Sequence, residues 1–302
     1  MMWVLDAFLS AFFAGVTAIL AKTGIKNTDS HLATALRTII VTLFAWLMVW
    51  VTGSFADLPN VTGTTLLFLV LSGLTTGASW LCYFKAISLG DVVKIAPVDK
   101  SSTILTMLLA FLLLGEPLTW LKGVCIVLIG AGTCMMIHTK KTEQPIPEGM
   151  SPHAPTQPFF KRNAWFFYAA LSAIFAALTT ILGKIGVQDI SSNLGTAIRC
   201  IVVLLLAWVI VFAQGTHRTI RTIDRRSIVF LVLSGIATGL SWLCYYSALK
   251  TGNASVVAPI DKLSILVTVL FSRVFLKEKL SPLALGGLLV MTAGTLLLLV
   301  KV

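Results

Sequence analysis

The sequence contains two copies of one apolar unit, aligned at a constant offset of 162 residues. Ser-Trp-Leu-Cys-Tyr at 79–83 recurs at 241–245, and Pro-Val-Asp-Lys at 97–100 recurs as Pro-Ile-Asp-Lys at 259–262. Self-similarity at a fixed offset over this length indicates two copies of one structural unit. Any fold for this chain therefore has to accommodate two equivalent halves.

Each copy contains five apolar segments of about 20 residues, the length that spans a bilayer as a helix. Because 57% of the residues are hydrophobic and only 12% are charged, a soluble globular protein is excluded. With five segments per copy, the second copy enters the membrane in the opposite orientation. We therefore predict an all-α polytopic membrane protein with ten transmembrane helices arranged as two inverted five-helix repeats. The predicted spans are 3–22, 31–52, 65–89, 92–114, 118–138, 164–184, 194–213, 227–250, 254–276 and 281–300.

The predicted organisation is a first repeat at 1–140, a linker at 141–162 and a second repeat at 163–302. The linker is rich in proline and polar residues, which is typical of a solvated, semi-extended segment rather than a further span. Lys and Arg are enriched at cytoplasmic flanks of membrane helices. Fifteen of the 23 cations lie on the linker side and four on the side of the termini, so the linker is expected in the cytoplasm and both termini outside.

The third apolar segment of each copy carries a stripe of hydroxyl-bearing residues on one helical face. The same segments contain Gly-x-x-x-Gly at 73–77 and 235–239, a spacing that permits close contact between helices. The hydroxyls could line a cavity or bond to their own backbone or a neighbouring helix, and Trp80 and Trp242 could form a cavity wall or pack in the core. The stripes are Ser72, Thr76, Ser79 and Tyr83, and Ser234, Thr238, Ser241 and Tyr245.

The fourth segment of each copy contains the sequence Pro-x-Asp-Lys, in which the aspartate follows the proline by two residues and the lysine comes directly after it. Proline within a helix leaves a backbone carbonyl without its partner, which a bilayer tolerates only where protein or water satisfies it. Ionisable groups at this depth usually line a pathway or pair with each other. The candidate residues are Pro97, Asp99, Lys100 and Ser102, with Pro259, Asp261, Lys262 and Ser264 in the second copy.

Arg37 and Arg199 lie at matching depths in the second segment of each copy. We predict that Arg37 pairs with Asp99 and that Arg199 pairs with Asp261. These pairs could be static links between helices, or they could face a substrate. Either interpretation places charged groups inside the bundle.

Four further charged residues lie at the ends of predicted helices. Lys22 and Lys184 close the first segment of each copy, and we expect their side chains to extend to the membrane surface. Glu116 and Glu278 precede the fifth segment of each copy, where an acidic residue favours the dipole of the following helix. We therefore expect capping by the two glutamates.

The chain resembles the EamA-type branch of the drug/metabolite transporter superfamily over nearly its whole length. The residues that carry the resemblance are the two five-helix copies, Leu-Gly-Glu-Pro-Leu-Thr at 114–119 and its counterpart at 276–281, and the glycines at the end of each fifth segment. It also resembles a tandem fusion of short, single-repeat EamA proteins. The resemblance implies helices one to four and six to nine around a central pathway, with helices five and ten peripheral. Many similar ten-helix proteins keep their termini in the cytoplasm, whereas the charge distribution here predicts them outside.

These features predict a secondary transporter, an exporter of a small polar metabolite or amino acid, working by alternating access in a bacterial or archaeal plasma membrane. The expected partners are a small-molecule substrate, membrane lipids and coupling protons. A homodimer is compatible with the sequence, and nucleic acid is not expected. No catalytic, metal or cofactor site is expected, because the four histidines lie at helix ends, in loops or in the linker. The alternatives are a lipid-handling protein or a membrane structural or regulatory protein.

Overall fold

The computed structural model describes residues 2–24, 29–89, 95, 98, 101–137, 164–275 and 281–301. Within these ranges the regular structure is entirely helical. The first copy contains α1 (Met2–Gly24), α2 (Ser30–Val51), η1 (Ser54–Asn60), α3 (Gly63–Leu89), α5 (Ser102–Leu114) and α6 (Trp120–Ile137). The second contains α8 (Ala164–Gly186), α9 (Ser192–Gln214), η2 (Thr216–Thr222), α10 (Arg225–Thr251), α11 (Ala254–Lys262), α12 (Ser264–Phe275), α13 (Pro282–Leu297) and η3 (Leu298–Lys301).

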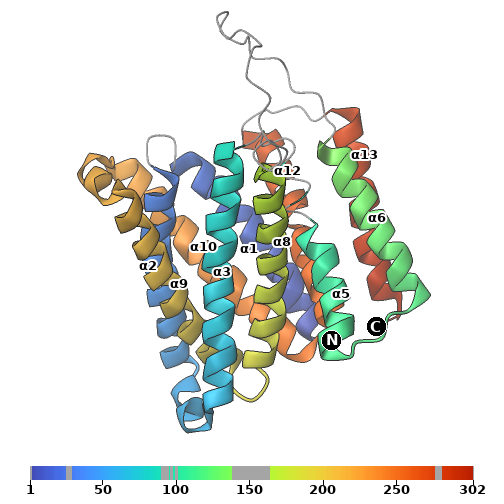
Figure 1. Cartoon of the computed structure of the whole chain (residues 1–302), viewed down its shortest axis with the longest axis horizontal. Helices are drawn as coiled ribbons and strands as arrows, with labels where there is room; N and C mark the ends of the chain where they lie inside the picture. Colours follow the sequence, from blue (N-terminus) through green and yellow to red (C-terminus); the bar gives the residue numbers. More distant parts are fainter. Residues whose placement is uncertain are drawn as a thin grey trace, which may run out of the picture.

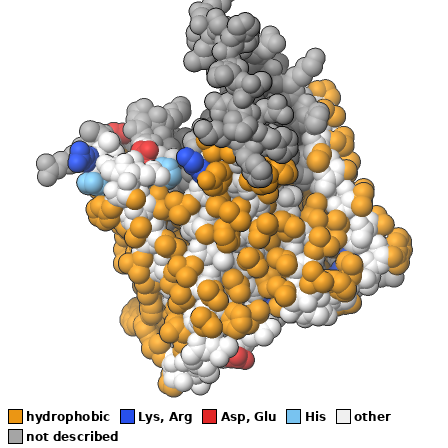
Figure 2. Space-filling model, viewed as in Figure 1, with side chains coloured by type: hydrophobic (Ala, Val, Ile, Leu, Met, Phe, Trp, Pro, Cys, Tyr) orange, Lys and Arg blue, Asp and Glu red, His pale blue; other side chains and the backbone are white. Residues whose placement is uncertain are grey.

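The bundle has the apolar surface of a protein that crosses a bilayer. Eight stretches of the described chain are long and apolar enough to span a membrane, and two shorter apolar helices, α5 and α6, accompany them. Figure 2 shows hydrophobic side chains covering the flank of the molecule, with most of the charged side chains in view near its upper end. The chain is thus a polytopic, all-helical membrane protein.

Helices from one copy pack mainly on helices from the other. α1 lies against α10, and α3 lies against α8, so equivalent helices make equivalent contacts (Figure 1). α2 packs on its own counterpart α9, and α6 packs on its counterpart α13. The α6–α13 pair lies at one side of the bundle in Figure 1. The core is therefore built between the two copies rather than separately within each.

The Gly-x-x-x-Gly segments of α3 and α10 allow this packing. A Cβ atom added at Gly73 would lie 2.7 Å from Val202 of α9, and one added at Gly235 would lie 2.7 Å from Ile40 of α2. Such distances are shorter than side chains tolerate, so these helices approach closely only because the positions are glycine. The predicted close helix contact at these glycines is confirmed.

The predicted ninth span, 254–276, is divided into two helices. α11 ends at Lys262 and α12 begins at Ser264, with Leu263 between them. The N–H of Leu263 bonds to the carbonyl of Ile260 at 2.9 Å, an i to i−3 bond instead of the α-helical i to i−4 bond to Pro259. Residues Ala254–Phe271 still form one stretch long and apolar enough to span a membrane, which agrees with the predicted span. Its helix is interrupted at Leu263, four residues after Pro259.

A related backbone bond occurs at the equivalent place in the first copy. The N–H of Ser101 bonds to the carbonyl of Val98 at 3.2 Å, and α5 begins at the next residue. The remainder of the predicted fourth span before this point lies largely outside the described residues.

Candidate functional site

A cavity of about 300 Å³ lies within the bundle. Its described lining residues come from α1, α3, α8, α9, α10 and α11, so both copies contribute to one site. Helices α6 and α13 contribute none of these residues. The lining is formed by Ala14, Thr76, Ser79, Trp80, Ala176, Thr179, Thr180, Arg199, Ser241, Trp242, Tyr245, Tyr246, Asp261 and Lys262.

Arg199 is the most constrained charged group of the cavity. Its side chain is buried, and its guanidinium carbon lies 4.9 Å from the ring centre of Trp242 and 4.7 Å from that of Tyr246. Contacts of this kind with aromatic faces are attractive because the ring quadrupole presents negative charge to the cation. The two aromatic rings of α10 therefore restrict the position of the guanidinium.

Two hydroxyls of α3 occupy one edge of this guanidinium. Nε donates to Ser72 Oγ at 3.0 Å, and Nη2 donates to Thr76 Oγ1 at 2.8 Å. Ser72 gives its own proton to the carbonyl of Thr179, and Thr76 gives its proton to the carbonyl of Ser72. Both hydroxyls are consequently fixed as acceptors for Arg199.

The predicted ion pair between Arg199 and Asp261 is wrong. Arg199 bonds to hydroxyls of α3, whereas Oδ1 of Asp261 accepts a hydrogen bond from Ser10 of α1 at 2.7 Å. The close approach of α3 to α9 at Gly73 brings the hydroxyls of α3 next to Arg199. Both charged residues still line the same cavity. The other predicted pair, Arg37 with Asp99, includes a residue outside the described part of the chain.

The two polar stripes form matching hydrogen-bonded seams between helices. Ser79 Oγ donates to the carbonyl of Ser172 at 3.1 Å, and its equivalent Ser241 donates to the carbonyl of Ser10 at 3.1 Å. Ser234 donates to the carbonyl of Thr17 at 3.4 Å, as Ser72 does to Thr179. The stripes thus join α3 to α8 and α10 to α1. Thr76, Ser79, Ser241 and Tyr245 also line the cavity.

Several candidate residues lie elsewhere. Arg37 is not among the described residues that line the cavity. Tyr83 packs on a separate hydrophobic cluster that contains Ala86 and Ala169. Ser102 and Ser264 begin α5 and α12, where their carbonyls accept from Thr106 and Thr268. Pro259 is buried inside α11. Thr238 donates to the carbonyl of Ser234 at 2.7 Å, and its Oγ1 lies 3.3 Å from Thr17 Oγ1. Pro97, Asp99 and Lys100 lie outside the described residues, whereas Lys262 lines the cavity.

Sequence reasoning missed the contributions of α1 and α8. Ser10 contacts both Ser241 and Asp261, and Thr179 contacts Ser72 and Thr76 of the α3 stripe. Tyr246 was missed because its counterpart in the first copy is Phe84, so the repeat pattern gave it no emphasis. The repeat did contain one signal, since Ser10 matches Ser172 and Thr17 matches Thr179 at the same offset.

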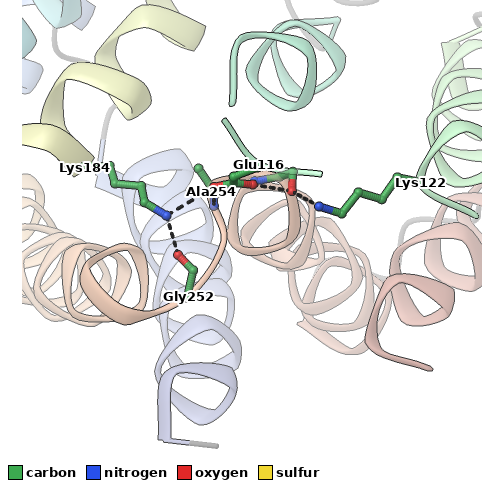
Figure 3. A network of polar contacts seen from close by, with 6 residues as sticks. Glu116, Lys122, Lys184, Gly252 and Ala254 are labelled. Carbon is green, nitrogen blue, oxygen red and sulfur yellow. Dashed lines mark hydrogen bonds and ion pairs between the residues drawn. The ribbon is translucent and has the colours of Figure 1, made fainter. Parts of the chain in front are cut away.

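A second group of buried charges lies around Glu116, in the connection between α5 and α6 (Figure 3). One carboxylate oxygen accepts from Lys184 Nζ at 3.2 Å and from the N–H of Ala254 at 2.6 Å. The other oxygen accepts from the N–H of Ser255 at 3.0 Å and from its hydroxyl. Lys184 also donates to the carbonyl of Gly252 at 2.6 Å. Glu116 therefore joins α8 to the N-terminus of α11.

These contacts correct two predictions. Lys184 does not extend to the membrane surface, because it is only 8% exposed and is paired with Glu116. Glu116 does satisfy a helix N-terminus, but the helix is α11 rather than the α6 that follows it in the sequence. The side chain of Lys22, and Glu278, lie outside the described residues.

The pKa of Glu116 is lowered from its ordinary value of 4.5. Burial alone raises the pKa, but the hydrogen bonds from Ser255, the charge of Lys184 and the N–H of Ala254 together outweigh it. A lowered pKa means that the folded protein favours the charged carboxylate.

Comparison with known proteins agrees with this architecture. The model of the EamA-like transporter family matches residues 1–138 and again 163–300. An uncharacterized transporter in the cobO 3′ region of Sinorhizobium sp. is 47% identical over 138 residues, which are 46% of this chain and 98% of that protein. An uncharacterized protein of Methanocaldococcus jannaschii is 27% identical over 134 residues, covering 42% of this chain and 90% of its own.

A solved crystal structure has a similar fold, with a TM-score of 0.74 and 16% sequence identity over 99% of this chain and 98% of that one. The two family matches together cover most of the sequence, and the family consists of transporters rather than enzymes. This multi-pass membrane protein belongs to the EamA-like transporter family.

Proposed function

We propose that the chain is a secondary transporter that exports a small polar metabolite or an amino acid by alternating access. The observation that carries the proposal is the cavity, which is charged, is lined by residues of both copies and lies inside an apolar bundle. Charged groups at membrane depth are costly and are typical of substrate or ion pathways. The break between α11 and α12 next to Asp261 is also typical of transporter binding sites.

The proposal includes ten spans in two inverted repeats. α1 of the first copy packs on α10 of the second, and the equivalent helix α8 of the second packs on α3 of the first. This reciprocal packing is expected when two copies are related by a two-fold axis. The labels of both chain ends also lie at the same end of the bundle in Figure 1, as an even number of spans requires. Alternating access would then open the cavity first to one side and then to the other.

Reconstitution into liposomes tests the transport proposal. We expect at least one metabolite or amino acid to cross faster in protein-containing vesicles than in empty ones, with a rate that depends on an imposed pH gradient. The variant Asp224→Asn should transport as fast as the wild type, because this exposed side chain only caps α10. Absence of flux for every solute under every ion gradient would reject the proposal.

Cysteine labelling in intact cells tests the proposed orientation. With the termini outside and residues 141–162 in the cytoplasm, a single cysteine introduced at position 150 should react with an impermeant maleimide only after the cells are permeabilised. A cysteine introduced at position 2 should react without permeabilisation. Reaction at position 150 in intact cells would show the opposite orientation and leave the transport proposal in place.

A further inference from the structure

We infer that the cavity binds its substrate through a carboxylate group held by the open edge of Arg199. The inference rests on the proposed transport function and identifies the chemical class that the site takes. A small monocarboxylate with an apolar or aromatic body fits the groups that line the cavity.

The argument begins with the donors of the guanidinium. Arginine has five N–H groups in a fixed planar arrangement. Ser72 and Thr76 use the edge formed by Nε and Nη2, so one N–H of Nη2 and both of Nη1 remain on the other side. Nη1 is buried and has no hydrogen-bond partner among the described residues. The remaining edge, formed by Nη1 and Nη2, has the geometry that receives the two oxygens of a carboxylate.

Leaving this edge without an acceptor is unfavourable. A buried donor without a partner has a desolvation cost that is larger when the group is charged. Trp242 and Tyr246 lie against the guanidinium, but aromatic faces do not replace an oxygen acceptor at Nη1. Because Arg199 itself lines the cavity, a carboxylate bound there lies next to the guanidinium and can reach toward the buried Nη1. A bound carboxylate would supply the missing acceptor.

The other charged groups select which carboxylate fits. Lys262 adds a second cation to the lining, whereas Asp261 adds a carboxylate that would repel a second anionic group. One carboxylate is therefore favoured over two. Phosphate is less suitable, because the formal charges of Arg199, Lys262 and Asp261 sum to +1, which balances a monoanion but not a dianion.

The aromatic lining indicates the rest of the ligand. Trp80, Trp242 and Tyr245 present ring surface to the same cavity. A volume of about 300 Å³ lies at the lower end of the range for small-molecule pockets. An apolar or aromatic body of modest size would bury its surface against these rings while its carboxylate reaches Arg199.

Ligand binding to the purified full chain in detergent tests the inference. The probes are monocarboxylates of two to ten carbons, free amino acids included, each paired with its primary amide. Dicarboxylates, inorganic phosphate, phosphate monoesters, primary amines and neutral sugars complete the set. Thermal shift identifies binders and calorimetry measures their Kd. We expect a monocarboxylate to bind best and its amide to bind about 10- to 100-fold more weakly, as the loss of charge-assisted hydrogen bonds predicts.

Variants at Arg199 and Lys262 separate a specific contact from general attraction. Arg199→Gln should lower the affinity for the best monocarboxylate about 10- to 100-fold and abolish the preference for acid over amide. Arg199→Lys retains the buried charge without the two-donor edge, so it decides the question if the glutamine variant does not fold. Lys262→Gln removes a cation from the same cavity and should weaken binding much less. Equal losses in the Arg199 and Lys262 variants would overturn the inference.

The remaining outcomes also have definite meanings. Tightest binding by an amine, a sugar or an amide, unaffected by Arg199→Gln, would overturn carboxylate recognition and leave the transport function standing. Tightest binding by phosphate monoesters through Arg199 would replace the carboxylate by phosphate and overturn the inference. Absence of binding by every probe class, together with absence of flux in liposomes, would reject both the inference and the proposed function.

Discussion

Replacing Glu116 by glutamine is expected to lower the free energy of unfolding by about 3–5 kcal/mol, the cost of breaking a buried ion pair. Every group around the carboxylate is a donor: Lys184, the N–H groups of Ala254 and Ser255, and the Ser255 hydroxyl. An amide offers only one acceptor atom and would direct its own N–H₂ at a donor. Thermal or denaturant unfolding in detergent measures the loss.

A double-mutant cycle and a matched control identify the cause of this loss. Glu116→Gln combined with Lys184→Met should cost less than the sum of the two single changes, because no unpaired buried charge remains. Asp224→Asn makes the same chemical change at another helix N-terminus, where Asp224 is exposed and accepts from Ser227. Because Asn and Asp cap helices about equally well, this control should change stability little. A loss at Asp224 equal to that at Glu116 would contradict the role of burial.

The stability difference between wild type and Glu116→Gln should depend on pH. Since the folded pKa of Glu116 lies below the ordinary value of 4.5, its contribution is present above about pH 4.5 and is lost as the pH falls through the folded pKa. The two proteins should therefore converge in stability at acid pH. A difference that grows as the pH falls would have the wrong sign.

Asp261→Asn is expected to abolish pH-driven net transport while leaving exchange of substrate across the membrane intact. Asp261 lines the cavity beside the break between α11 and α12, and it accepts a hydrogen bond from Ser10 instead of pairing with Arg199. An amide cannot ionise, so the substitution removes this residue as a carrier of the coupling proton in the proposed mechanism. Asp99→Asn, at the equivalent position, is expected to behave in the same way. Proteoliposomes loaded with the best ligand and subjected to a pH jump measure both activities.

Asp6→Asn provides a matched control for this result. Asp6 is also an aspartate that accepts a hydrogen bond from a serine, Ser247, at 2.7 Å, the same length as the bond from Ser10 to Asp261. It is not among the described residues that line the cavity. The control variant should retain pH-driven transport. Full pH-dependent flux in both Asp99→Asn and Asp261→Asn would show that the aspartates are structural and that coupling occurs elsewhere.

Features that depend on nearby residues were predictable. The apolar segments indicated the helices because the length and polarity of a span are local properties. Gly73 and Gly235 indicated close helix contact because a missing side chain permits it whatever the partner is. Proline before Asp261 indicated a disturbed helix, although not that α11 and α12 would be separate helices.

The partners of the buried charges required the tertiary structure. Arg199 and Asp261 have suitable charges and depths, but the rotation and lateral position of α9 direct Arg199 to α3, and those of α11 direct Asp261 to α1. Glu116 precedes α6 in the sequence, yet the fold brings the N-terminus of α11 to it. Amino-acid order determined which segments form apolar helices and that Arg199 lies within one of them, but not that Lys184 is buried. Only the packing of helices from distant parts of the chain decided which acceptor each buried donor meets, because hydrogen bonds act over about 3 Å.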